Sequence, residues 1–150
     1  MSDLSDLYQE VILDHNRRPK NFGTMVNPDA QADGHNPLCG DRWTVALRVS
    51  GGIICDILFT GAGCAISKAS ASLMTEAVRE RSVEEALALF GRFQAVITAP
   101  MDQEIDTEGI GKLSVLAGVR EFPMRVKCAT LAWHTLKAAI TREAEIVKSE

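Results

Sequence analysis

Four side chains in this sequence have the chemistry to hold a metal ion together: Cys39, Asp41, Cys64 and Cys128. Cys39 and Asp41 flank a glycine in the stretch Asn36–Asp41, where a non-helical turn can place a thiolate beside a carboxylate. Thiolate and carboxylate groups are zinc ligands, and a thiolate-rich set favours zinc or an iron–sulfur cluster over hard cations. We predict that these four residues meet at one metal-sized site.

The other two thiols of this set are expected at the starts of helices. Cys64 follows a glycine-rich turn, and Cys128 lies shortly after Pro123. The free N–H groups of a helix start favour the thiolate form, and Arg125 and Lys127 would add to this effect at Cys128. The sequence has no Cys-x-x-Cys pair, so only tertiary structure can assemble the site. Spacing alone does not separate a metal site from four unrelated small side chains.

Other chemically active residues have simpler interpretations. Cys55 shares one face of a predicted strand with apolar residues, and we interpret it as a small core residue. His15 and His35 are interpreted as surface histidines, and His134 as structural or exposed. The pair Gly61 and Gly63 lacks the third glycine of a dinucleotide-binding turn.

The elements that would position the site begin with a helix. Apolar residues at helical spacing predict an amphipathic helix that ends near Asp14–Asn16: Leu4, Leu7, Tyr8, Val11 and Ile12. The segment Arg17–Asn36 is rich in Pro, Gly and Asn and is predicted to be a loop, with room for a short edge strand at Thr24–Val26 or Ala30–Ala32.

A hairpin follows the loop. Apolar and polar residues alternate from Trp43 to Val49, and the return strand is predicted over Ile53–Thr60. Between them Gly51 and Gly52 tolerate the positive φ angles of a two-residue turn.

The second half of the chain is predicted to be helical. The expected segments are a helix over Ala65–Arg79, a helix opened by the capping box Ser82-x-x-Glu85, a loop over Ala99–Gly111, a short helix over Lys112–Val119 and a last helix after Pro123. Apolar residues on one face of the last helix include Ala132, Trp133 and Leu136. Together these elements predict an α+β fold in one domain, residues 1–150, with a small antiparallel sheet of about three strands against several helices.

Composition limits the class of protein. The 150 residues contain 16 Lys and Arg against 20 Asp and Glu, a net charge of −4, which argues against nucleic acid as the main partner. The acidic start Met1–Asp6 lacks the apolar segment of a signal peptide, and no apolar run approaches the length of a membrane span. We therefore expect a cytoplasmic protein, where disulfides are rare and cysteines more often bind metals or react.

Three stretches together resemble the U-type iron–sulfur cluster assembly family, which includes IscU, SufU and the N-terminal domain of NifU. They are Asn36–Asp41, Gly61–Ser67 with Ala69–Ser72, and Val126–Cys128, and the opening Leu7–His15 with Pro19–Gly23 is similar as well. The resemblance covers nearly the whole chain. It implies a SufE/NifU-like fold and a functional site at Cys39, Asp41, Cys64 and Cys128.

Two features resemble the SufU branch of that family. Lys127 stands where IscU-type members carry a histidine, and a protonated lysine has no lone pair for a metal. The stretch Gln94–Gly111 resembles the insertion typical of SufU. The SufU branch implies a zinc-dependent sulfurtransferase that accepts persulfide sulfur from a pyridoxal-phosphate cysteine desulfurase of the SufS kind. In the mechanism it implies, a desulfurase residue displaces one cysteine from zinc, and Cys39, in the flexible loop, is our choice for the acceptor.

Two alternatives stay open. The same four residues could carry a labile [2Fe–2S] cluster on a scaffold that hands it to apo-proteins. They could also form a closed zinc site with a purely structural role.

Overall fold

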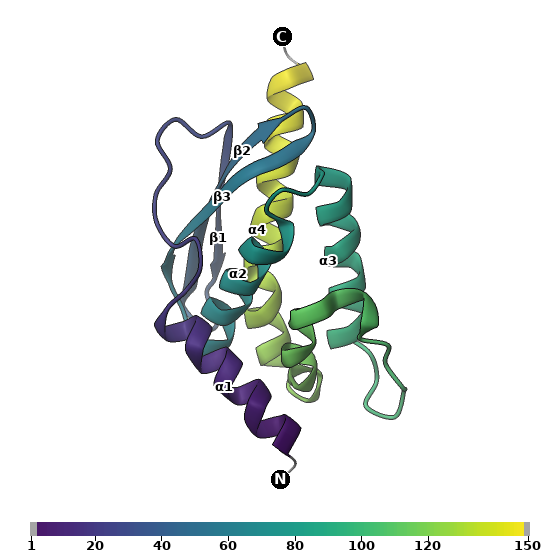
Figure 1. Cartoon of the computed structure of the whole chain (residues 1–150). Helices are drawn as coiled ribbons and strands as arrows, with labels where there is room; N and C mark the ends of the chain where they lie inside the picture. The colour runs from purple at the N-terminus through teal and green to yellow at the C-terminus, as the bar shows by residue number, and fades with distance from the viewer. Residues whose placement is uncertain (1–2, 149–150) are drawn as a thin grey trace.

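A computed structural model describes the backbone of residues 3–148 and the side chains of residues 8–142 (Figure 1). Its elements, in chain order, are α1 (Asp3–Arg17), β1 (Ala30–Asn36), β2 (Asp41–Ser50), β3 (Ile53–Ala62), α2 (Ala65–Val78), α3 (Val83–Ile97), the 3₁₀ helix η1 (Glu108–Glu121) and α4 (Pro123–Lys148). The first predicted helix is confirmed, although the side chains of Leu4 and Leu7 lie outside the described residues.

The three strands form one antiparallel sheet in the order β1-β2-β3. The helices gather on one side of it, with α4 against β1 and β2 and α2 against β3 (Figure 1). The core between these layers consists of side chains with no exposed surface, among them Trp43, Val45, Leu47, Phe59, Met74 and Trp133. This arrangement confirms the predicted α+β class.

Strand β1 corrects the predicted loop Arg17–Asn36. Its whole length pairs with β2, from Ala30 opposite Leu47 to Asn36 opposite Asp41. Of the two candidate edge strands, Ala30–Ala32 is therefore confirmed and extended, whereas Thr24–Val26 forms no strand. The segment has few residues that favour strands, but its small side chains allow α4 to pack closely on it.

The prediction that Cys55 is a buried core residue is wrong. The β2–β3 register pairs Arg48 with Asp56 but Val49 with Ile54, so Cys55 is the extra residue of a β-bulge. The bulge exchanges the buried and exposed faces of β3 for the residues that precede Asp56. Ile54 is fully buried as a result, whereas Cys55 is exposed.

The helical half of the chain follows the prediction closely. Ser82 caps α3 and accepts a hydrogen bond from the Glu85 amide at 3.1 Å, as the capping box requires. The predicted apolar face of α4 is buried. The predicted loop Ala99–Gly111 is too long, because η1 already begins at Glu108 and continues through a kink at Gly111, which has φ +53°. Among the described helices, none is long and apolar enough to cross a membrane.

Replacing either of two glycines by alanine should change the free energy of unfolding, in opposite directions. A methyl group at Gly34 in β1 would run into the side chain of Thr135 on α4, whereas one at Gly91 on the exposed face of α3 would meet nothing within 4 Å. We expect Gly34→Ala to lower the free energy of unfolding by roughly 1–3 kcal/mol, because overpacking strains the β1–α4 contact. Gly91→Ala should raise it by about 0.5–1 kcal/mol through helix propensity.

Urea denaturation of the metal-free chain measures both changes. Equal effects of the two substitutions would contradict the described packing of β1 on α4.

Candidate metal centre

Cys39 lies in the tight turn that joins β1 to β2. Asn36, the last residue of β1, holds this turn: its Oδ1 accepts the Leu38 N–H at 3.1 Å, and its carbonyl oxygen accepts the Gly40 N–H at 2.8 Å. Gly40 has φ +74°, a conformation that glycine adopts without strain. The turn therefore presents Cys39 to solvent and places Asp41 at the first position of β2.

The carboxylate of Asp41 is fully buried and ties the hairpin to the start of α2. Its Oδ1 accepts the Cys64 N–H at 2.9 Å, and its Oδ2 lies 3.9 Å from the Cys64 sulfur. Gly63 makes this approach possible, since a Cβ at that position would come within 3.0 Å of Asp41 Oδ1 and 2.7 Å of the Trp43 ring. Two segments distant in sequence are thereby fixed against each other.

Cys64 is the N-cap residue of α2, as its predicted place at a helix start requires. Its sulfur accepts the Ser67 N–H at 3.4 Å. The Ser67 hydroxyl in turn accepts a hydrogen bond of 2.7 Å from Nε1 of Trp43, and both of these residues are fully buried. Cys64 thus has its backbone and its sulfur fixed, although its side chain remains exposed.

Cys128 comes from α4 and is only 4% exposed. Its sulfur lies 3.3 Å from the sulfur of Cys39. A hydrogen bond from the Ser70 hydroxyl to the Ala129 carbonyl oxygen joins α2 to α4 directly beside it. The third thiol is therefore held by the packing of two helices.

The prediction that a helix start favours the Cys128 thiolate is wrong. Helix α4 begins at Pro123, so Cys128 lies in its second turn rather than at its first N–H groups. Burial raises the pKa of the Cys128 thiol well above its usual range, and hydrogen bonding to Cys39, Cys64 and Asp41 raises it further. A cation beside Cys128 would oppose this effect, because a nearby positive charge favours the thiolate form.

The four predicted residues come together in the structure. Ligand atoms of Cys39, Asp41 and Cys128 lie within 4.8 Å of one another, and Cys64 joins them through its contact with Asp41. In a tetrahedral zinc site with Zn–S distances near 2.3 Å, ligand atoms are roughly 3.8 Å apart. The donor set is therefore of the right kind for zinc. Cys39, Asp41 and Cys128 already form a cluster close to the size of a zinc site, whereas Cys64 lies outside that cluster and borders it through Asp41.

A groove of about 710 Å³ opens onto the three thiols. Its walls come from α1, η1 and the start of α4, and its lining residues include Tyr8, Ile12, Val115, Val119, Met124 and Arg125. Large apolar side chains are exposed nearby, among them Leu13, Leu38, Phe122 and Met124. The thiols are thus reachable from solvent through a partly apolar opening.

The histidines and Cys55 do not join the centre. Cys55 lies in the bulge of β3, and His35 and His134 are exposed. His15 is not the predicted surface residue, because it is 5% exposed with Nδ1 at 2.7 Å from Ser72 Oγ and Nε2 at 3.6 Å from Glu76. Burial lowers the His15 pKa, and Glu76 partly opposes this effect. His15 thus fastens α1 to α2.

Trp43 and Ser67 are supporting residues that sequence reasoning missed. The spacing Cys64-x-x-Ser67 is that of an N-cap residue and the third residue after it, so the cap was open to prediction. The contact of Trp43 with Ser67 depends on how β2 packs against α2, and nothing local in the sequence signals it.

Comparison with known proteins finds relatives that match nearly the whole chain. Residues 7–148 match the model of the NifU-like N terminal domain. The zinc-dependent sulfurtransferase SufU of Bacillus subtilis is 39% identical over 143 residues, 95% of this chain and 95% of that protein. The iron–sulfur cluster assembly scaffold protein IscU of Streptococcus pyogenes is 42% identical over 147 residues, 96% of this chain and 89% of that protein.

A solved structure supports the fold. The N-terminal part of a NifU-like protein from Brucella abortus matches with a TM-score of 0.83 over 96% of this chain and 99% of that chain. Its sequence identity is 24%, so this likeness bears on the fold alone.

The burial of the thiols predicts their order of alkylation. In the metal-free, reduced protein we expect iodoacetamide to modify Cys39, Cys55 and Cys64 before Cys128, because thiolates react and Cys128 is buried with a raised pKa. A molar equivalent of zinc should then protect Cys39, Cys64 and Cys128 but leave Cys55 unchanged.

Peptide mass spectrometry reads each position separately, with Cys55 as the internal control. Zinc that protected Cys55 equally, or left Cys39 and Cys64 reactive, would show that these thiols do not share a metal.

Proposed function

The chain belongs to the family of NifU-like N-terminal domains, and from this membership we propose that it serves iron–sulfur cluster assembly as a zinc-dependent acceptor and carrier of sulfur. The similarity to a zinc-dependent sulfurtransferase supports the activity. The observation that carries the proposal is the convergence of three thiols and one buried carboxylate at an open groove.

We propose Cys39, Asp41, Cys64 and Cys128 as the residues that hold the metal. Three sulfurs and one oxygen match the donor preference of zinc. Zinc, when bound, keeps its thiolate ligands deprotonated and protects them from unwanted reaction. Asp41 cannot leave the centre easily, because its carboxylate is buried and accepts the Cys64 N–H.

The three thiols differ in their freedom to move, and this difference favours Cys39 as the acceptor. Cys128 is buried in a helix, and Cys64 accepts a backbone hydrogen bond at an N-cap. Cys39 is exposed in a turn whose hydrogen bonds run to Asn36 rather than to a second element. All three line the groove, and Cys39 is the one whose turn can move while Cys64 and Cys128 stay in place.

The transfer step follows from ordinary thiol–persulfide chemistry. The Cys39 thiolate attacks the outer sulfur of a protein persulfide, the S–S bond of that persulfide breaks, and a persulfide forms on Cys39. The donor cysteine leaves as a thiolate. Any proton on the transferred sulfur exchanges with water. No external oxidant or reductant is needed, because the oxidised sulfur only changes its carrier.

A pyridoxal-phosphate cysteine desulfurase of the SufS type is the proposed donor of this sulfur. The groove supports this choice, since its mouth combines exposed apolar side chains with the cation of Arg125, which lies over the Phe122 ring at 4.6 Å. Aromatic, methionine and arginine side chains are common at protein interfaces. Because the acceptor thiols must stay reduced, we propose that the protein acts in the cytoplasm.

A second function is supported by the similarity to a cluster assembly scaffold. On this alternative the same four residues hold a [2Fe–2S] cluster that passes to apo-proteins. Lys127 is exposed and adds no ligand, so the ligand set would be the same in both cases. Bound iron with acid-labile sulfide, in place of zinc, would favour this alternative.

Substitution of the proposed ligands tests the main proposal. We expect Cys39→Ser, Asp41→Ala, Cys64→Ser and Cys128→Ser to abolish the acceleration of a cysteine desulfurase, because each removes a metal ligand or the acceptor. Cys55→Ser is the matched control and should accelerate the desulfurase as the unmodified chain does.

Alanine release from cysteine measures desulfurase turnover, and intact-protein mass measures the sulfur gained by Cys39. Full acceleration by any one of the four variants would remove that residue from the proposed centre.

A further inference from the structure

One side chain beside the candidate metal centre has a hydrogen-bond donor that the fold leaves unpaired. Asn36, the last residue of β1, is 8% exposed, and its Nδ2 is buried with no hydrogen-bond partner among the described residues. The turn fixes which amide atom is which, because Oδ1 accepts the Leu38 N–H at 3.1 Å. A buried N–H group without a partner costs free energy, so this donor calls for an acceptor.

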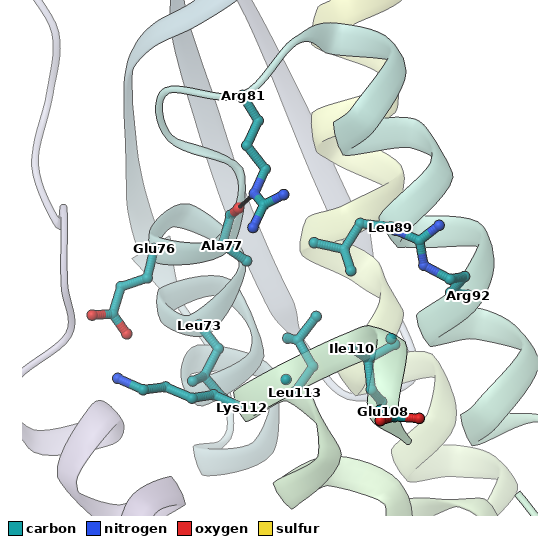
Figure 2. Close-up of a pocket in the computed structure, with 12 residues that line it drawn as sticks. Leu73, Glu76, Ala77, Arg81, Leu89, Arg92, Glu108, Ile110, Lys112 and Leu113 are labelled. Atoms are coloured by element: carbon teal, nitrogen blue, oxygen red, sulfur yellow. Dashed lines mark hydrogen bonds between the residues drawn. The ribbon is translucent and has the colours of Figure 1, made fainter. Parts of the chain in front are cut away.

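The charged groups around a cavity of about 470 Å³ between α2, α3 and η1 make no such demand (Figure 2). Figure 2 shows them pointing in different directions, and Arg81 donates from Nε to the Ala77 carbonyl oxygen at 2.7 Å. They carry both signs of charge, and all of them are exposed to water: Glu76, Arg81, Arg92, Glu108 and Lys112. The buried amide of Asn36 is therefore the polar group that needs an explanation.

The surroundings of Asn36 follow from the way β1 runs along α4. A Cβ at Gly34 would meet the side chains of Thr135 and Leu131. Nearer the start of β1, the Arg142 side chain donates to the Gln31 carbonyl oxygen at 2.8 Å. Residue numbers in α4 therefore fall as those in β1 rise.

Asn36 lies on the same face of β1 as Gly34, two residues further along, which is about 7 Å in a strand. The same length corresponds to about four or five residues of a helix, so Asn36 comes level with the turn of α4 that contains Cys128. The Asn36 carbonyl oxygen also accepts the Cys39 N–H at 3.3 Å, and the Cys39 sulfur lies 3.3 Å from that of Cys128. Asn36 is thus placed between these two ligands.

The sulfur of Cys128 is the proposed ligand that needs a donor. The Cys64 sulfur accepts the Ser67 N–H at 3.4 Å, and Cys39 is exposed to water. Cys128 is only 4% exposed, and in the part of the chain that the structure describes no N–H or O–H group donates to its sulfur. Metal ligands are commonly held by hydrogen bonds from groups that do not touch the metal. An unpaired donor and a sulfur without a donor therefore lie side by side.

We propose that Asn36 is a positioning residue of the metal centre, whose Nδ2 donates a hydrogen bond to the metal-bound thiolate of Cys128. A hydrogen bond to a charged acceptor is stronger than one to a neutral acceptor. Through its Oδ1 the same side chain holds the turn of Cys39. One amide thereby links the ligand that stays on the metal to the ligand that leaves it. This inference rests on the proposed function, because it requires a metal at the four residues.

Cadmium-113, a magnetic substitute for zinc, tests this contact directly by NMR of the full chain. Coupling of cadmium to the cysteine Cβ hydrogens identifies the bound thiolates. We expect one Nδ2 hydrogen of Asn36 to move downfield when the metal binds and to couple to cadmium through the Cys128 sulfur. The internal control is Asn21, whose Nδ2 donates to Thr75 Oγ1 at 3.1 Å, and its side chain should show neither effect.

The substitution Asn36→Asp separates the donor from the turn. Its carboxylate keeps an acceptor for the Leu38 N–H but offers no hydrogen to the sulfur, and its added charge by itself would attract a divalent cation. We expect Asn36→Asp and Asn36→Ala to weaken zinc binding about tenfold to a hundredfold, measured by competition with a chelator. Asn27→Asp makes the same change in an exposed loop and should bind zinc as the unmodified chain does.

The possible results separate this inference from the proposed function. Cadmium that couples to Cys128 but not to Asn36 would overturn the inference and leave the metal centre in place. A loss of zinc affinity in Asn36→Ala alone, with Asn36→Asp unchanged, would assign the side chain to the turn and overturn it as well. Cadmium that couples to none of the proposed cysteine ligands would overturn both.

Discussion

The hydrogen bond from the Cys64 amide to the buried Asp41 carboxylate is the contact on which the arrangement of the centre depends. It joins the first residue of β2 to the N-cap of α2, and the absence of a side chain at Gly63 makes room for it. An ionised carboxylate without exposure to water is costly unless hydrogen bonds and a nearby cation compensate it. One amide supplies part of that compensation, so the thiol cluster beside Asp41 is a place where a metal ion would stabilise the fold.

The three thiols differ in how many contacts from other elements hold them in place. Cys128 is fixed by the packing of α2 on α4, and Cys64 by the cap and by the Trp43–Ser67 hydrogen bond beneath it. The backbone hydrogen bonds of Cys39 lie within its own turn, and its sulfur contacts the Cys128 sulfur. A sulfur carrier needs this combination, since the metal must remain bound while one thiol becomes free to react. A closed structural zinc site would not need an exposed ligand beside a groove.

Local sequence pattern predicted much of the fold. The hairpin, the capping box at Ser82 and the apolar face of α4 all depend on nearest neighbours in sequence, and the structure confirms them. Strand β1 was missed for the most part because its stability comes from pairing with β2 and packing under α4 rather than from its residues. The predicted burial of Cys55 and the predicted exposure of His15 were wrong for a similar reason. A β-bulge decides the first, and a contact between two helices decides the second.

The candidate site shows the same division. The residue types indicated metal chemistry, but their wide spacing could not show that they converge, and the family resemblance supplied that expectation. The predicted place at a helix start is confirmed for Cys64, the N-cap residue of α2. It is wrong for Cys128, because Pro123 begins α4 more than a full turn earlier.

The identity of the metal shell is the most direct test of this account. X-ray absorption at the zinc edge of protein purified without oxygen would count the ligand atoms. The account predicts three sulfurs near 2.3 Å and one oxygen at about 2.0–2.2 Å, with no second metal nearby. A shell with fewer than three sulfurs, or iron with an iron neighbour in place of zinc, would contradict it.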